Sequence, residues 1–458
     1  MVILSALLLG LTPTVFFQEP EETELEAAQR KVAELEEELG PEHLDLVDAW
    51  SDVVMAYYQE GQYEAVEEGC RRILKIQEKA LGSDHLDVAT TLNNFAAFLM
   101  FQGSNAEARP LFERSLEILE TTLGPEHEQV ADLLNNLAQV LGNLGSHAKA
   151  LPLHERALAI KEKALGPEHP SLGLYLNNLA ILLQTMGAYS KAHPLFERAL
   201  AIREKAFGRE HLNTAESLNN LANLLRIQGA YSEALPLLER SLAIKEKALG
   251  PEHADVAISL NNLATLFQSM GSYSKARLLY ERALRIKEKA LGPGDPSLAT
   301  SLNNFGVVLY KEGFYAEARP LYERALAIRE KALGLEHPEV AKSLNNLALL
   351  LKSTGFYLEA RPLFERSMAI KEKTLGPTHP SLATSLHNLA ELFAAVGSHA
   401  EARPLYKSGL RKTLKHLVQN MGSMTESARF QYLKIQTGPE PLLLNLVALQ
   451  GIGPKKTD

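Results

Sequence analysis

The sequence has little cysteine, no cluster of basic residues and a net negative charge. Cys70 is its single cysteine, so the chain can form neither an intrachain disulfide nor a cysteine-based metal cluster. The formal net charge is −9, and no run of Lys and Arg offsets it. This balance argues against nucleic acid or an anionic membrane as the main partner, so we expect no nucleic-acid binding.

The motifs of common catalytic sites are also missing. The sequence contains no GxxxxGK[ST] or GxGxxG phosphate-binding loop, no GxSxG elbow and no HExxH pair. Carboxylates are plentiful, but they recur along the chain instead of converging on one site. We therefore predict that the chain is not an enzyme, and that it uses no metal, no cofactor and no small-molecule substrate.

The N-terminal residues 1–17 are almost wholly apolar, and the acidic stretch 18–22 follows them. Their length is that of a signal-peptide core and slightly short for a membrane span. No Lys or Arg precedes the apolar run, and no small-x-small cleavage site is clear. An apolar extension packed on the first helix is the alternative. We favour export or anchoring over a cytoplasmic location, with membrane contact only if the segment is an uncleaved anchor.

A period of 42 residues dominates the rest of the chain and appears as two ladders of glycine. A fixed period in this range indicates a solenoid of stacked repeats. The first ladder consists of Gly61, Gly103, Gly145, Gly187, Gly229, Gly271, Gly313, Gly355 and Gly397. The second ladder consists of Gly40, Gly82, Gly124, Gly166, Gly208, Gly250, Gly292, Gly334 and Gly376.

Each repeat reads as two helices. In the eighth copy, apolar residues recur at helical spacing along the first helix, at Leu344, Leu347, Ala348 and Leu351. Gly355 can end this helix in the left-handed conformation, and a second helix starts near Tyr357. We expect residues 1–22 to be an apolar segment with an acidic linker and residues 23–40 a capping helix. Nine repeats should follow over residues 41–420, with a non-repeat helical tail over 421–458.

The repeat resembles the tetratricopeptide repeat, in the 42-residue form of kinesin light chains and many bacterial proteins. The residues that carry this resemblance are Leu344 to Ala348 (Leu-Asn-Asn-Leu-Ala), Gly355 to Tyr357, Pro362 to Arg366 and Leu375 to His379. It covers about residues 23–420. It implies an all-α fold, a right-handed superhelical solenoid of helix pairs, that acts as a scaffold for a protein or peptide partner.

Two narrower functions stay open as alternatives. Residues 427–433 resemble the segment that joins such repeats to a caspase-like CHAT domain in bacterial proteins. The chain would then be the regulatory or sensor module of such an effector system. A cargo adaptor like a kinesin light chain is the other alternative, but it would normally need a long coiled coil, and residues 23–39 are too short for one.

Pairs of asparagines on the first helices are the strongest candidates for partner binding. An amide both donates and accepts hydrogen bonds, which suits the backbone of an extended peptide. The resemblance implies that the first Asn of each pair contacts such a peptide in a concave groove lined by first helices. The alternative is a hydrogen-bond ladder between repeats, which we favour for the second Asn. The groove candidates are Asn93, Asn135, Asn177, Asn219, Asn261, Asn303 and Asn345.

Charged residues further along the first helices differ between copies. Arg226, Lys311 and Lys352 are basic, and we include them in the candidate groove site. The corresponding acidic side chains are Asp132, Glu216 and Glu391. Variation on a repetitive scaffold is where partner specificity is expected, and the basic residues would favour an acidic peptide. Simple solvation of these side chains is the competing interpretation.

One histidine per repeat precedes most first helices, and Asp295 takes its place in the seventh copy. These histidines lie a full repeat apart and have no second ligand at helical spacing, so the pattern does not favour a metal site. We interpret them as helix-capping residues. Cys70 occupies a position that holds large core residues in other copies, so we interpret it as a core residue.

Overall fold

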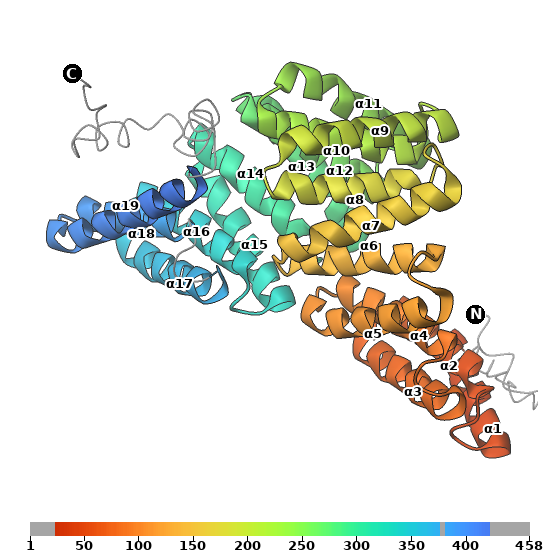
Figure 1. Cartoon of the computed structure of the whole chain (residues 1–458). Coiled ribbons are helices and arrows are strands. Elements are labelled where there is room, and N and C mark those ends of the chain that lie inside the picture. Colours follow the sequence, from red (N-terminus) through yellow and green to blue (C-terminus); the bar gives the residue numbers. More distant parts are fainter. Residues whose placement is uncertain (1–22, 376–380, 422–458) are drawn as a thin grey trace, which may run out of the picture. The chain divides into compact units, whose positions relative to one another are not determined.

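The computed structural model describes residues 23–375 and 381–421, which form nineteen α-helices and no strand (Figure 1). The prediction of an all-α helical solenoid is confirmed. The apolar segment 1–17 and the tail beyond Met421, including the CHAT-like residues 427–433, lie outside the described residues. Among the helices that the structure describes, none is long and apolar enough to cross a membrane.

The first helix, α1 (Glu24–Leu39), lies where the capping helix was expected. It begins with a capping box: the Thr23 hydroxyl accepts from the Glu26 amide at 3.1 Å, and the Glu26 carboxylate accepts from the Thr23 amide at 2.9 Å. Val32 packs against Ala49 and Val53 of the next helix. The helix thereby covers an apolar face that the first repeat could not otherwise bury.

Nine helix pairs follow, and we call the two members of each pair the first and the second helix. The first helices are α2 (Leu46–Gln59), α4 (Leu86–Phe101), α6 (Glu128–Asn143), α8 (Leu172–Thr185), α10 (Leu212–Gln228), α12 (Ala254–Ser269), α14 (Leu298–Glu312), α16 (Pro338–Ser353) and α18 (Ser381–Ala395). The second helices are α3 (Tyr63–Leu81), α5 (Asn105–Leu123), α7 (His147–Leu165), α9 (Tyr189–Phe207), α11 (Tyr231–Leu249), α13 (Tyr273–Leu291), α15 (Tyr315–Leu333), α17 (Tyr357–Leu375) and α19 (His399–Met421).

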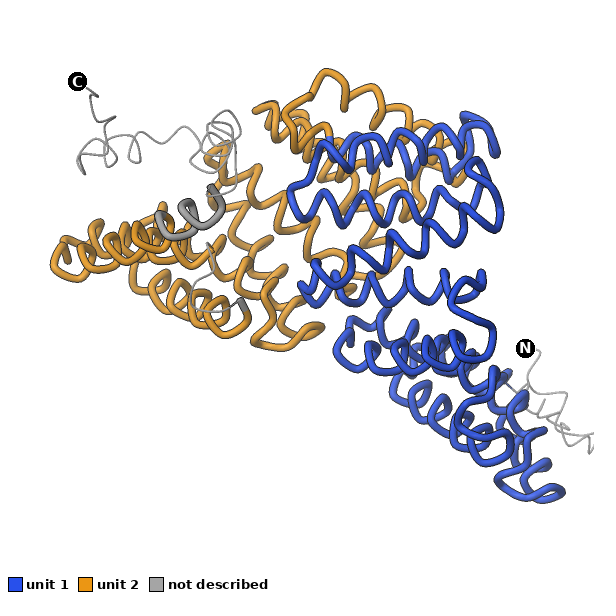
Figure 2. The backbone as a smooth tube through the Cα atoms, in the orientation of Figure 1, with its two compact units in different colours: residues 1–224 blue, residues 225–458 orange. Residues whose placement is uncertain are grey.

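The pairs belong to two compact units, residues 1–224 and residues 225–458 (Figure 2). In the first unit α6 contacts α4 and α8, and in the second unit α14 contacts α12 and α16. Second helices pack against the first helices on either side of them in sequence, as α3, α5, α7, α13, α15 and α17 do. In the second unit the core is built on buried aromatic side chains, among them Tyr280, Tyr322 and Phe364. Ala318 and Ala360 are fully buried beside them. Their small side chains let the paired helices approach closely.

The turns between paired helices explain the first glycine ladder. At the end of α14, Gly313 has φ 86° and ψ 6°, in the left-handed region, and its amide donates to the carbonyl of Leu309 or Tyr310. A residue with a Cβ is strained in this region, whereas glycine is not. The chain therefore reverses directly into α15, which brings the two helices of the repeat face to face.

Candidate partner-binding site

The asparagine pairs form hydrogen bonds between neighbouring first helices. At four junctions between repeats, the second Asn donates from Nδ2 to Oδ1 of the first Asn in the preceding repeat. In the first unit, Asn136 donates to Asn93 at 3.4 Å and Asn178 to Asn135 at 3.0 Å. In the second unit, Asn346 donates to Asn303 and Asn388 donates to Asn345, both at 2.9 Å. The expected ladder through the second asparagines is confirmed.

First asparagines also belong to this ladder, although the sequence predicted it for the second asparagines only. Asn93, Asn135, Asn303 and Asn345 accept its bonds. The buried Oδ1 atoms of Asn177 and Asn261 accept none, and these two amides instead donate onward, to Ser217 at 3.3 Å and to Ser301 at 2.9 Å. Three of the seven candidates, Asn135, Asn177 and Asn219, are buried, and the other four are half-buried. Groove contact by these residues stays a prediction, and the structure gives them a second role in joining the repeats.

The three predicted basic residues lie in the second unit but do not form one cluster. Lys352 forms an ion pair with Glu391 of the next first helix, and only 17% of its side chain is exposed. Arg226 donates to the Ser269 hydroxyl at 3.4 Å, while Lys311 is exposed at the end of α14. Of these three residues Lys311 alone is exposed, and Glu391 partly neutralises Lys352.

The variable acidic residues are also engaged within the protein. In the first unit, Asp132 and Glu128 both accept from the buried Lys161, at 3.1 and 2.7 Å. Glu216 accepts from the buried Arg203 at 3.1 Å. Asp132 and Glu216 therefore each contact a buried cation of a second helix, whereas Glu391 pairs with Lys352 of a first helix.

A pocket of about 360 Å³ lies in the second unit beside two neighbouring first helices, α14 and α16. Two of the predicted asparagines, Asn303 and Asn345, line it. The complete lining consists of Thr300, Asn303, Asn304, Arg329, Glu339, Lys342, Asn345, Asn346 and Lys371. The pocket lining carries three cations against one carboxylate.

Two of the cations come from second helices, whereas the basic residues predicted from the sequence all lie on first helices. Arg329 of α15 is buried and donates to the Ser343 hydroxyl at 2.8 Å, with the Glu339 carboxylate at 3.0 Å. Burial lowers its pKa from the usual range, and Glu339 acts against this. Lys371 of α17 is half-buried and donates to the Ser385 hydroxyl at 3.0 Å.

A signal for these cations was present in the sequence. A Lys or Arg recurs at one second-helix position every 42 residues, at Lys161, Arg203, Lys245, Lys287, Arg329 and Lys371. Cations are favourable near the C-terminus of a helix, so the sequence alone gives the same explanation for Lys371 and Lys373. The two lie nearly opposite each other around the helix, however, and Lys373 pairs with Glu336 while Lys371 reaches the pocket.

The sequence matches the model of the tetratricopeptide repeat over residues 87–163, 129–205, 194–247, 213–289, 297–355 and 341–413. These matches together span more than half of the chain. The chain belongs to the tetratricopeptide repeat family. The family consists of non-catalytic interaction scaffolds, so the chain is a repeat scaffold for protein or peptide partners.

Solved structures show the same kind of repeat. TPR-like repeats from a Podosopora anserina protein described as a kinesin light chain are 33% identical, covering 45% of this chain and 98% of that one, with a TM-score of 0.41. BtubC (BKLC) from P. vanneervenii is 22% identical, covering 53% and 92%, with a TM-score of 0.42. A Rap protein complexed with Competence and Sporulation Factor is 15% identical over 84% and 98%, and its TM-score of 0.53 shows a shared fold. A comparison with curated proteins gave no match.

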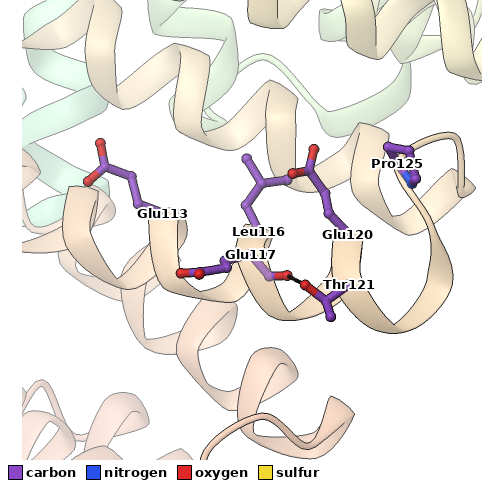
Figure 3. A pocket seen from close by; sticks show the side chains of 6 residues that line it. All are labelled: Glu113, Leu116, Glu117, Glu120, Thr121 and Pro125. Atoms are coloured by element: carbon purple, nitrogen blue, oxygen red, sulfur yellow. Dashed lines mark hydrogen bonds between the residues drawn. The ribbon is translucent and has the colours of Figure 1, made fainter.

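Another hollow of this tetratricopeptide scaffold, of about 430 Å³, lies on α5 in the first unit (Figure 3). All of its lining residues but Pro125 come from this one helix. Glu113 pairs with Arg109 at 2.7 Å and Glu120 with Arg156 at 2.6 Å. Since one helix forms nearly the whole lining and two of its carboxylates are already paired, we do not assign a site there.

The recurring histidines cap the first helices, as predicted. Nδ1 of each accepts from the backbone amide two residues on, at His85, His127, His253 and His337. In the seventh copy Asp295 accepts from the Ser297 amide at 2.8 Å, in the same geometry. His379 lies outside the described residues. Capping thus explains why aspartate can replace histidine at this position.

Cys70 is a core residue, as its repeat position predicted. It is buried in α3, and burial together with the nearby Glu67 raises the pKa of its thiol to about 11. At neutral pH the side chain is therefore an uncharged thiol, which is a poor nucleophile.

Proposed function

We propose that the second unit binds an extended, acidic segment of a partner protein along its first helices. The observation that carries this proposal is the pocket beside α14 and α16, which contains both asparagine pairs of these helices together with Arg329, Lys342 and Lys371. A scaffold of this family needs a surface that recognises backbone and side chains at once, and this pocket offers groups for both.

The asparagines supply the groups that suit a peptide backbone. Asn303 and Asn345 are half-buried, and the ladder uses the Oδ1 atom of each. Because an Asn side chain also carries two N–H groups, the ladder leaves donors that could meet the carbonyls of an extended segment. The ladder bonds also fix the two amides in place, which lowers the entropy lost on binding.

The charges set the preference for acidic side chains. Arg329, Lys342 and Lys371 face one carboxylate, Glu339, in the pocket. At the repeat position of Thr300 and Lys342, the first unit has Asp132 and Glu216 instead. The same scaffold position is thus acidic in parts of one unit and neutral or basic in the pocket of the other, which favours an acidic segment in the second unit.

A charge substitution at Thr300 tests the proposal. Thr300 is exposed in the pocket lining, and Thr300→Asp introduces the residue that the third repeat carries at the same position, so the fold should accept it. We expect fluorescein-labelled peptides of glutamate and serine to bind the wild type, and the variant to bind them at least tenfold more weakly. Fluorescence anisotropy measures both affinities.

Two controls make the result specific. Ala327→Asp adds the same charge to an exposed position of α15 outside the pocket lining, and it should leave the affinity unchanged. Peptides in which glutamine replaces glutamate should bind weakly to every variant. Equal affinity of the Thr300→Asp variant and the wild type for the acidic peptides would place their binding elsewhere and refute the proposal.

A further inference from the structure

Lys371 differs from Lys161, Arg203 and Arg329, which occupy the same repeat position, in what surrounds it. Lys161 contacts two carboxylates, Arg203 contacts Glu216, and Arg329 contacts Glu339. Lys371 instead donates to the Ser385 hydroxyl, and no carboxylate of the described residues pairs with it. Residues 376–380, which the structure does not describe, contain no Asp or Glu in the sequence.

A second cation lies where a neutralising acid stands in other repeats. Lys342 of α16 occupies the repeat position of Asp132, whose carboxylate accepts from Lys161 in the third copy. The eighth copy therefore has two ammonium groups where the third has an ion pair. Lys342 contacts Glu339, but Glu339 also pairs with Arg329, so one carboxylate serves two cations.

Such an arrangement weakens the fold unless something compensates for it. Burial lowers the pKa of Lys371, and the charge of Lys342 lowers it further. A threonine stands at the position of Lys342 in the second, seventh and ninth copies, so the repeat does not require a cation there. Like charges held together at a cost are typical of a site that receives the opposite charge.

We infer that Lys342 and Lys371 bind a doubly charged oxyanion of the phosphate type at the edge of the pocket. Both lysines line the same pocket, two ammonium groups match two negative charges, and hydrogen bonds from a cation to an anionic oxygen are among the strong ones. The anion could be inorganic phosphate or a phosphorylated side chain of a partner. This site does not depend on the proposed peptide binding, because a free anion can occupy it alone.

Thermal unfolding with and without phosphate tests the site. Phosphate should raise the Tm of the wild type above its value in chloride of equal ionic strength. Lys342→Thr should show two opposite changes. Without phosphate its Tm should rise by about 2 °C because the repulsion is gone, and its response to phosphate should need at least tenfold more anion.

Lys331→Thr is the matched control, since it removes one positive charge from an exposed position of the same unit outside the pocket. It should retain the phosphate response of the wild type. Lys371→Met, which keeps the aliphatic chain, should lose that response in the same way as Lys342→Thr. An identical phosphate response in the wild type and in Lys342→Thr would overturn the inference, and so would a lower Tm of Lys342→Thr without phosphate.

Peptides distinguish the two sources of the anion. If a phosphoserine peptide competes with inorganic phosphate and its unphosphorylated form does not, the site takes a phosphorylated partner. If inorganic phosphate alone raises the Tm, the site takes the free ion. If neither does so beyond the effect of chloride, the inference fails. Loss of acidic-peptide binding in Thr300→Asp with an intact phosphate response would show that the two sites are separate.

Discussion

The two units of this tetratricopeptide scaffold treat the same buried cation differently. In the first unit, Lys161 and Arg203 find carboxylates on first helices. In the second unit, Arg329 also pairs with a first-helix carboxylate, Glu339, whereas Lys287 donates to the Ser297 carbonyl oxygen and Lys371 to a serine hydroxyl. Each of these second-helix residues is a Lys or an Arg, so the difference arises from the first helices that face it.

This difference shows how a repeat can acquire a site without a change of fold. Paired helices and turn glycines recur in the two units, and asparagine bonds join neighbouring first helices in both. Replacing an acid such as Asp132 by Thr300 or Lys342 at one first-helix position leaves cations without full neutralisation. Specificity then lies in the departures from the repeat, while stability lies in what the copies share.

The shared core gives the largest expected effect. Leu179 and Leu347 occupy the same repeat position in the two units, with 5% and 6% exposure. Leu179→Ala and Leu347→Ala should each cost about 2–5 kcal/mol of unfolding free energy through the cavity they leave. Urea unfolding measures both, and peptide binding by folded Leu347→Ala should be unchanged. A large cost in one unit alone would show that the cores are not equivalent.

Acid should separate the units through His154. This residue is 3% exposed, at the repeat position where the second unit has Tyr280, Tyr322 and Phe364. Burial lowers its pKa to about 4, whereas the unfolded chain takes up the proton near 6.5. The free energy of unfolding is therefore not reduced by His154 above pH 6.5. It falls as the pH drops toward 4, by on the order of 3 kcal/mol, because the folded protein resists protonation of this side chain.

The leucine of the fifth copy provides the matched variant for this test. Leu238 stands at the repeat position of His154, so His154→Leu should fold and should remove this part of the acid sensitivity. Tm measured from pH 7 to pH 4 should fall more steeply for the wild type than for the variant. Parallel curves would mean that His154 is not held in its neutral form by burial.

Removing the neutralising acids should make the first unit resemble the second. The double variant Glu128→Gln and Asp132→Thr leaves Lys161, whose side chain is 6% exposed, without a carboxylate. We expect a cost of about 2 kcal/mol, less than for a fully buried pair because both carboxylates are about half exposed. Urea unfolding measures it. The loss should reverse if Lys161→Met is added, and a persistent loss would assign the effect to the carboxylates alone.

The smallest effect is expected at Lys373, two residues from Lys371. Its partner Glu336 is exposed, as is Lys373 itself, so Lys373→Ala should change the unfolding free energy by well under 1 kcal/mol. Thermal unfolding checks this, and phosphate should raise the Tm of the variant as it does for the wild type. A changed phosphate response would mean that any positive charge at this end of α17 affects phosphate binding, whichever face of the helix carries it.

The sequence was enough to predict the fold because each copy repeats the same apolar spacing and the same turn glycines. The caps at His85 and Asp295 and the core position of Cys70 followed from the repeat in the same way. The pocket was harder to predict. Its Lys371 follows the pattern of the third to seventh copies, and what makes it distinctive is a residue of another helix, Lys342. Periodicity alone does not show which side chains meet across helices.

The asparagine pairs illustrate the same limit. Their spacing shows that both lie on first helices, but it cannot show that the amide of one repeat reaches the amide of the preceding repeat. The bond from Asn346 to Asn303 depends on how closely α14 and α16 approach. Function and stacking were therefore assigned to different members of a pair, whereas the structure uses both members for stacking.

Hydrogen–deuterium exchange with and without a saturating acidic peptide tests the central claim most directly. The account predicts slower exchange in residues 298–312 and 338–353, the helices beside the pocket, and no change in residues 128–143 of the first unit. Protection confined to the first helices of the first unit, or no protection at all in α14 and α16 of a saturated complex, would contradict it.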